Sequence, residues 1–520
     1  MEVFSNGSFL SCEDPNRVFS VLAVEEGRIV HCGDHPPGGP APVKRTDLGG
    51  RCVVPAFGDS HIHFTSFSLF RAGLDCRDAA DFADLAERIL IHSMERPRRK
   101  ILIGFGLSAH SVKEGRLPDR AFLDRVTSRP LAIVKYDGHG AVANGALAAG
   151  LPRSVTEARG FHGDTGWFYQ DAFFRFIDHV TRSVSPVEVF ENLIGGSGFM
   201  AGRGIGLIHT VEGVGFPLDL DVDMMRFAAR GLSQEFRVYF QTMNIARVLR
   251  RRMPRVGGCF ATALDGCFGS EDAALREPYG NDETSRGVLY YPQEQVDRFV
   301  KAANRAGLQV ELHAIGDAAV DQALTAYARA LEDFPREDHR HVIIHGCLME
   351  GDQIARAAEL GIHIALQTPF LHWKLEPFPY LERLLGKRTA RLSPLRDMTE
   401  AGLVIANGSD GPCTLPDPLY GIWAACNHPD PSQSVTVLDA LRMHTIGCAR
   451  LSFDERDRGT LTEGKVADFA VLDGNPLETN PADLRRIRVT GLYLRGKPFP
   501  APPSGAPGLF LSGLLGRKFP

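Results

Sequence analysis

The central part of the chain alternates between short apolar runs and segments with helical spacing. The run "GLQVELH" ends at His313, and the segment after it places Val320 and Leu324 on one helical stripe. "RHVIIH" ends at His345 and also precedes a helical segment, and the rhythm continues to "LVIANGSD", which ends at Asp410. Strands and helices that alternate in this way predict βα units around a parallel sheet. Repeated often enough, such units close into an eight-stranded barrel.

The two ends of the chain show a different pattern, in which short strands are separated by Gly and Asn turns. We therefore expect one small β-domain built from both termini, residues 1–54 and 451–500, around a barrel over residues 55–450. Residues 75–190 are too many for one βα step and predict an insertion over the barrel mouth. Residues 501–520 form an extension, for which a contact with another subunit and a disordered terminus remain alternatives.

Composition and charge exclude several classes of partner. The chain has 520 residues, of which 44% are hydrophobic and 23% charged, and its formal net charge is -5. This balance is typical of a globular protein and gives no reason to expect nucleic acid or a membrane as the partner. No apolar run reaches the ~20 residues of a membrane span, and no signal peptide is visible, so we expect a cytoplasmic protein. The ten scattered cysteines contain no CxxC pair, which predicts reduced thiols rather than a Cys-based zinc site.

Histidine and aspartate side chains stand at the predicted strand ends. In "VPAFGDSHIHF", His61 and His63 are two residues apart and would project from the same face of a strand. His313, His345 and Asp410 end three later strands, and the carboxyl ends of barrel strands all face one mouth. Each residue alone also fits a hydrogen-bonded or solvated role, or a turn for Asp410. Five of them in barrel order predict a shared metal site.

Motifs along nearly the whole chain support this interpretation. "VPAFGDSHIHF", "ELHAIGDAAVDQAL", "VIIHG", "LQTPF" and "NGSDGPCTLPDPLYGIWAA" resemble the amidohydrolase superfamily, most closely the branch called amidohydrolase family 3, which includes N-substituted formamide deformylases. The resemblance implies an α/β fold: a distorted (βα)8 TIM-type barrel with a small β-sandwich formed from both termini. It also implies site roles: metal ligands at His61, His63 and His313, a ligand or substrate polariser at His345, and a ligand and proton acceptor at Asp410.

One position departs from the family pattern. The family usually carries a carboxylated lysine, bridging two metals, four residues before an Asp-Gly on the fourth strand. Ala261 occupies that place in "GGCFATALDGCFGS" and cannot bridge anything. Asp265, Glu212 and Glu311 are the alternative bridges, and none is compelling. We therefore expect a single divalent ion, in which case His345 need not bind it.

Further polar residues are expected around the metal site. Asp265 and Asp317 are predicted to stand behind the ligands, although Asp317 equally fits a helix cap. His139 in the insertion, Gln367 at the seventh strand end and His110 are predicted to contact the substrate. For His139 an exposed turn is the alternative.

The predicted activity is hydrolysis of a carbonyl-type substrate (amide, cyclic amide or N-acyl group) by metal-activated water. Zinc is the expected ion, with manganese and iron as alternatives. Hydrolytic C–C ring opening of a cyclic ketone, deamination and decarboxylation are alternative reactions at the same site, and a non-catalytic binding barrel is a further alternative. We expect a small-molecule substrate and a homodimer.

Overall fold

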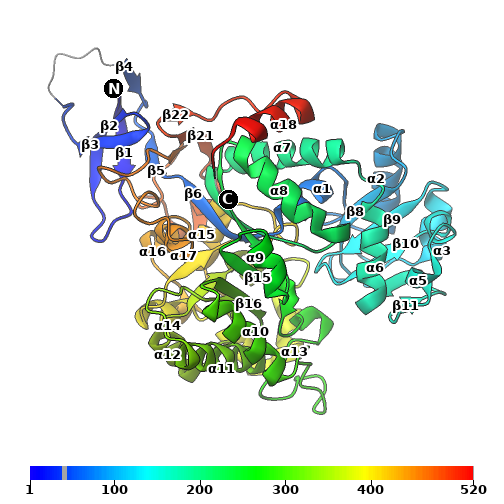
Figure 1. The fold of residues 1–520 in the computed structure, drawn as a ribbon. Helices are drawn as coiled ribbons and strands as arrows, with labels where there is room; N and C mark the ends of the chain where they lie inside the picture. Colours follow the sequence, from blue (N-terminus) through cyan, green and yellow to red (C-terminus); the bar gives the residue numbers. More distant parts are fainter. Residues whose placement is uncertain (38–43, 519–520) are drawn as a thin grey trace.

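The central unit of the computed structural model, which describes residues 1–37 and 44–518, is a parallel β-barrel (Figure 1). Its strands, in the order in which they pair, are β6 (Phe57–Ile62), β13 (Ile205–Glu212), β14 (Glu235–Phe240), β15 (Arg255–Ala263), β16 (Gln309–Ala314), β17 (Val342–His345), β18 (His363–Leu366) and β19 (Ile405–Asn407). The barrel closes between its first and last strands, where the Asp410 amide donates to the His61 carbonyl over 2.8 Å. The predicted (βα)8 fold is confirmed.

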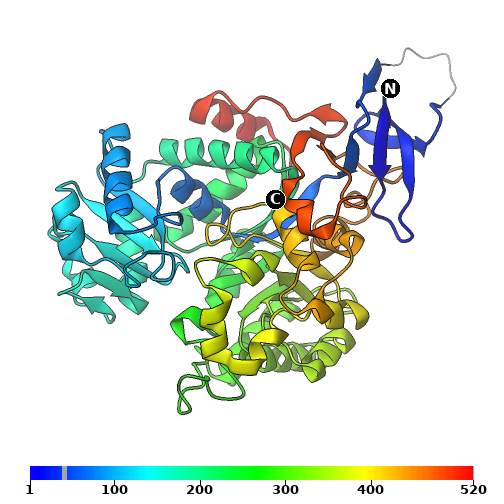
Figure 2. The ribbon, with the colours of Figure 1, turned by 180° about the vertical axis from the view of Figure 1, so that it is seen from behind.

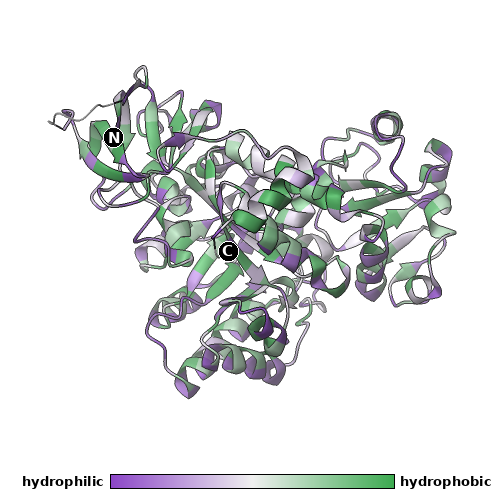
Figure 3. Ribbon diagram, turned by 45° about the horizontal axis from the view of Figure 1, so that its top comes forward, coloured by the Kyte–Doolittle hydropathy of each residue, from purple (hydrophilic) through white to green (hydrophobic). Residues whose placement is uncertain are grey.

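Helices cover the outside of the barrel. They include α1 (Phe64–Arg71), α7 (Pro186–Gly202), α8 (Leu220–Gly231), α10 (Gln293–Arg305), α11 (Asp317–Asp333), α12 (Gly351–Glu359), α15 (Pro418–Cys426) and α17 (Ile446–Leu451). The apolar stripe of α11 is buried, and Val320, Leu324 and Tyr327 have no exposed surface. Figure 3 shows the resulting distribution, with apolar residues on the strands and polar residues on the outer faces of the helices.

A second sheet joins the two ends of the chain. Its strands are β1 (Glu2–Leu10), β2 (Val18–Glu25), β3 (Arg28–Gly33), β4 (Lys44–Asp47), β5 (Cys52–Pro55), β20 (Phe469–Leu472), β21 (Val489–Leu494) and β22 (Lys497–Pro498). The strand β5 pairs with β1 on one side and with β20 on the other, so the two termini share one sheet. The exact domain boundaries stay predictions, and so does the description of this terminal sheet as a β-sandwich.

The predicted insertion has a sheet of its own. It contains β7 (Leu74–Asp75), β8 (Leu102–Leu107), β9 (Leu131–Lys135), β10 (Gly140–Ala143), β11 (Phe161–His162) and β12 (Trp167–Tyr169), with helices α2 (Phe82–Glu95) and α6 (Gln170–Thr181). Figure 2 shows this unit on the opposite side of the barrel from the terminal sheet. It therefore stands where it can build one wall of a site at the barrel.

The end of the chain forms a helix, α18 (Gly505–Leu515), which packs on α7 and α8 (Figure 1). The last two residues of the predicted extension, 519–520, lie outside the described residues. Among those that are described, no helix is both long and apolar enough to cross a bilayer.

Candidate metal centre

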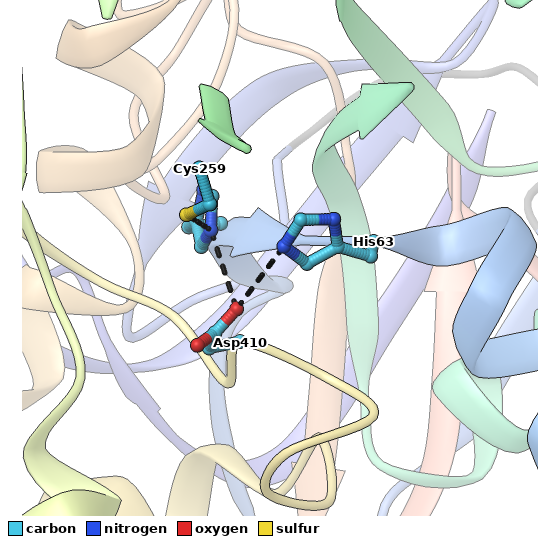
Figure 4. A group of neighbouring side chains, drawn as sticks. His63, Cys259 and Asp410 are labelled. Carbon is cyan, nitrogen blue, oxygen red and sulfur yellow. Dashed lines mark hydrogen bonds and ion pairs between the residues drawn. The ribbon is translucent and has the colours of Figure 1, made fainter. Parts of the chain in front are cut away.

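Two histidines that follow the first barrel strand and an aspartate that follows the last one meet at the mouth of the barrel. His61 lies on β6 and His63 directly precedes α1, while Asp410 follows β19. The Asp410 Oδ1 lies 3.3 Å from His61 Nε2 and 3.4 Å from His63 Nε2. In Figure 4, the ring of His63 faces the Asp410 carboxylate and Cys259 lies beside them. The sequence prediction that these side chains converge agrees with this geometry.

The other two predicted ligands form a second group on neighbouring strands. His313 lies near the end of β16 and His345 ends β17, and their ring centroids are 4.6 Å apart. His345 adopts a left-handed backbone with φ of 72°, and Asp410 does the same with φ of 52°. Strained conformations of non-glycine residues persist where the surrounding structure enforces them, and they gather at functional sites.

Burial and pairing set the charges of these groups. Burial lowers the pKa of His345 to about 4, and it also lowers the pKa values of His61 and His313. The imidazoles are therefore neutral at pH 7, as metal ligands must be. Burial opposes ionisation of Asp410, but hydrogen bonds with His61 and His63 outweigh it and hold its pKa well below the usual range.

The arrangement fits a divalent cation. The His61 Nδ1 and the His313 Nδ1 are buried and have no hydrogen-bond partner among the described residues, and the Asp410 Oδ1 contacts the Nε2 atoms of His61 and His63. Donor atoms of His61, His63, Asp410 and Cys259 lie within 4.8 Å of one another, a spacing that a shared cation would complete. Neutral imidazoles with a carboxylate are a donor set typical of zinc, manganese and iron sites.

The structure adds one residue that the sequence did not single out. Cys259, on β15, is 6% exposed, and its Sγ lies 3.0 Å from His61 Nε2 and 3.4 Å from His345 Nε2. The sequence predicted a plain core thiol here and no Cys ligand, because no CxxC spacing marks this position. The sequence signal nearest to it is Ala261, which stands two residues further along the same strand where the family usually carries a lysine.

Glu212, Glu311 and Asp265, the three alternatives to the missing bridging lysine, do not lie between the ligands. The Glu212 side chain accepts from the Thr65 amide and the Thr210 hydroxyl. Glu311 is buried and belongs to neither ligand group, and burial raises its pKa to about 8. Asp265 accepts from the amides of residues 274, 315 and 316, with its Oδ1 3.5 Å from His313 Nε2. Asp265 thus stands behind a ligand, as the sequence analysis proposed.

Gln367 and Asp317 have different roles from those expected. The Gln367 Oε1 lies 2.5 Å from His345 Nδ1, and its amide donates to Ala365 O, so Gln367 holds a ligand ring rather than a substrate. Asp317 is the first residue of α11 and not its cap, and its carboxylate accepts from the Arg276 amide.

His139 and His110, both predicted to contact the substrate, differ in their position relative to the cavity. His139 lines the cavity above the ligands, and its Nδ1 lies 2.7 Å from the Asp137 carbonyl. His110 is exposed and stacks on Tyr380 with centroids 4.1 Å apart, outside the cavity lining. A turn carries the His110 side chain to the surface, so the structure gives no support to its predicted contact with the substrate, which stays a prediction.

The cavity above the ligands has a volume of about 140 Å³ and a largely aromatic wall. The wall includes Phe70, Phe105, Phe173, Phe174, Phe216, Phe260, Phe268, Phe370, Trp373 and Phe378. The residues of the candidate metal centre that line the cavity are His63, Cys259, His313, His345 and Asp410. Asp137 and Glu376 also line it, whereas its described lining contains no lysine or arginine. The Asp137 carboxylate is paired with Lys135 over 2.7 Å.

Comparisons with known proteins agree with this site. A model described as "Amidohydrolase family" matches residues 45–160 and 257–499. The chain is 27% identical to the putative amidohydrolase YtcJ of Bacillus subtilis (strain 168), over 96% of this chain and 99% of that protein. It is 24% identical to the N-substituted formamide deformylase of Arthrobacter pascens, over 94% of this chain and 96% of the relative.

Solved structures show the same fold. A metal-dependent hydrolase from Pyrococcus furiosus superposes with a TM-score of 0.73 and 24% sequence identity, over 92% of this chain and all of that one. The atrazine chlorohydrolase TrzN from Arthrobacter aurescens TC1, solved with zinc, gives a TM-score of 0.51 at 17% identity, over 96% and 95% of the two chains. The chain therefore belongs to the amidohydrolase family, as its motifs predicted, and is a metal-dependent hydrolase.

Proposed function

We propose that this enzyme hydrolyses an uncharged amide that carries a bulky apolar group, with zinc as its metal. The observation that carries the proposal is the cavity: its wall is aromatic, and its described lining has no lysine or arginine. A carboxylate on the substrate would lose its hydration there without gaining a cationic partner, which is costly. The formamide deformylase among the relatives acts, by its name, on N-substituted formamides, and this supports the same substrate class.

The side chains around the cavity have complementary roles in this reaction. His61, His63 and Asp410 would hold a divalent cation, which would supply an acidified water and a polarised carbonyl when bound. Asp410, kept ionised by its two imidazole neighbours, takes the proton of the attacking water and passes it to the amide nitrogen. A C–O bond forms, the C–N bond breaks, and the amine leaves neutral. Gln367 holds the His345 ring in place beside these groups through its contact with Nδ1.

The family match favours amide hydrolysis over C–C ring opening, deamination or decarboxylation. We also propose a homodimer, because Phe510, Leu511, Leu514 and Leu515 of α18 are at least half exposed on its outer side. The cytoplasmic location stays a prediction.

A matched substrate pair tests the proposal. N-formylphenethylamine and N-formylphenylalanine differ only in a carboxylate, and we expect the neutral compound to have a kcat/KM about 10²-fold higher, with loss of activity on chelation and recovery with zinc. Equal rates, a preference for the acid, or failure to cleave N-formyl and N-acetyl derivatives of apolar amines would overturn it.

A further inference from the structure

Cys259 belongs to both ligand groups at the barrel mouth. Its sulfur forms one cluster with donor atoms of His61, His63 and Asp410, and a second cluster with those of His313 and His345. Within each cluster the donor atoms lie within 4.8 Å of one another. No other described residue is shared by the two clusters. The sulfur therefore stands between two sets of ligands that are otherwise separate.

We propose that the Cys259 thiolate bridges two divalent cations, one held by His61, His63 and Asp410 and the other by His313 and His345. This inference rests on the metal-dependent function proposed above and replaces the expectation of a single ion. The second group offers only two imidazoles by itself, whereas catalytic zinc sites use three protein ligands and leave a fourth position open. A shared thiolate supplies the missing ligand, and sulfur is a ligand that zinc favours.

The backbone before and after Cys259 has an irregular conformation that fixes the position of its sulfur. Gly257 and Gly258 precede Cys259 with φ of 124° and 147°, and the strand register shifts directly after them. A Cβ on Gly257 would lie 2.0 Å from the Glu311 carbonyl, so only glycine allows this approach. The Gln241 Oε1 accepts from the amides of Cys259 and Phe260 over 3.0 Å each and fixes the irregular segment.

The surroundings of Cys259 differ from those of a structural thiol. Cys448, buried in the same barrel, directs its sulfur at the carbonyl oxygens of Asn407 and Met443. Such contacts satisfy a neutral thiol as a weak donor. The Cys259 sulfur instead faces ring nitrogens of two predicted metal ligands, His61 and His345. A sulfur placed between ring nitrogens of two predicted ligands can bind the same cations as they do.

Ion content and X-ray absorption of the full-length wild-type enzyme test the bridge without any substitution. The protein is purified under reducing conditions, stripped with a chelator and reconstituted with zinc. We expect two zinc ions per chain, and each ion should have one sulfur neighbour at about 2.3 Å. One zinc per chain, or two zinc ions without sulfur, would overturn the bridge.

A pair of cysteine variants identifies the sulfur. With cobalt(II) in place of zinc, the wild type should show a sulfur-to-cobalt charge-transfer band in the near ultraviolet. Cys259→Ser should lose that band and at least half of the bound ions. Cys413→Ser is the matched control, because Cys413 lines the same cavity but belongs to neither ligand cluster, and it should keep both. A Cys259→Ser protein with unchanged band and ion content would refute the inference.

The two proposals fail in different ways. A wild-type enzyme that cleaves apolar amides with one zinc and no sulfur neighbour loses the bridge and keeps the proposed function. A protein that binds no divalent ion and is indifferent to chelators loses both.

Discussion

Polar side chains at the two ends of the barrel have different partners. At the amino ends of the strands, two half-buried arginines are paired with carboxylates: Arg237 at the start of β14 binds both oxygens of Asp454, and Arg340 before β17 binds Glu455. At the carboxyl ends, donor atoms of His61, His63, Asp410 and Cys259 lie within 4.8 Å of one another, and the described residues pair Asp410 with imidazoles rather than with a lysine or arginine. The amino end holds the fold together, and the carboxyl end is prepared for ions and substrate, as in other barrel enzymes.

The largest effect is expected from Asp410→Asn at the carboxyl end. The amide cannot accept the proton of the attacking water, so kcat should fall by about 10²–10⁴-fold. Thermal unfolding with chelator present should shift less than in a variant that leaves a charge without a partner, because the Asn oxygen can still accept from the His61 and His63 rings. Steady-state kinetics and calorimetry measure both, and an enzyme within tenfold of wild type would remove Asp410 from the mechanism.

The reverse pattern is expected from Arg237→Met at the amino end. This change leaves the half-buried Asp454 carboxylate without its cation and with only the Ser452 hydroxyl as a side-chain partner, which should cost about 2–4 kcal/mol of unfolding free energy. Activity per folded molecule should not change. Arg305→Met is the control, since the Arg305–Asp333 pair is exposed on the arginine side and should contribute at most about 1 kcal/mol. Equal losses in the two variants would contradict the comparison.

Gln367→Leu tests whether Gln367 holds the His345 ring in its orientation. Without its partner the His345 ring can rotate, and metal affinity or kcat should fall by about 10–100-fold. Competition with a chelator measures the affinity. If instead KM alone rises, Gln367 contacts the substrate, as the sequence analysis first predicted.

Glu212→Gln examines the pH dependence of stability. Burial and the neighbouring Asp221 carboxylate raise the pKa of Glu212 in the folded protein. A carboxyl group with a raised folded pKa stabilises the fold below its unfolded pKa of about 4.3, and this contribution is lost as the pH rises through the folded value. The wild type should therefore lose more stability than the variant between about pH 4.3 and the raised value. Denaturant titrations over that range decide, and identical slopes would disprove the assignment.

His110→Ala should have the smallest effect. Its ring lies on the surface against Tyr380, so kcat/KM should change less than about twofold and stability by less than about 0.5 kcal/mol. A tenfold loss of kcat/KM would place this side chain in the site after all.

Regular βα units explain why so much of the site could be predicted. His61, His63, His313, His345 and Asp410 all follow apolar strands, and parallel strands bring their carboxyl ends to one mouth whatever the exact packing. The outward turn at His110 and the turn of Gln367 toward His345 depend on loop conformation and on neighbouring strands. No local pattern records either of them.

The sequence by itself determined the barrel, the family and which strand-end histidines and aspartate meet at the mouth, because hydrophobic periodicity and short motifs are local properties of the chain. Only the tertiary structure decided that Cys259 lies between the two ligand groups. Two left-handed glycines and the Gln241 amide shift the register of β15 there, and the same shift leaves Ala261 unused. An irregularity of this kind arises from contacts between strands distant in sequence, and a count of residues along one strand cannot reveal it.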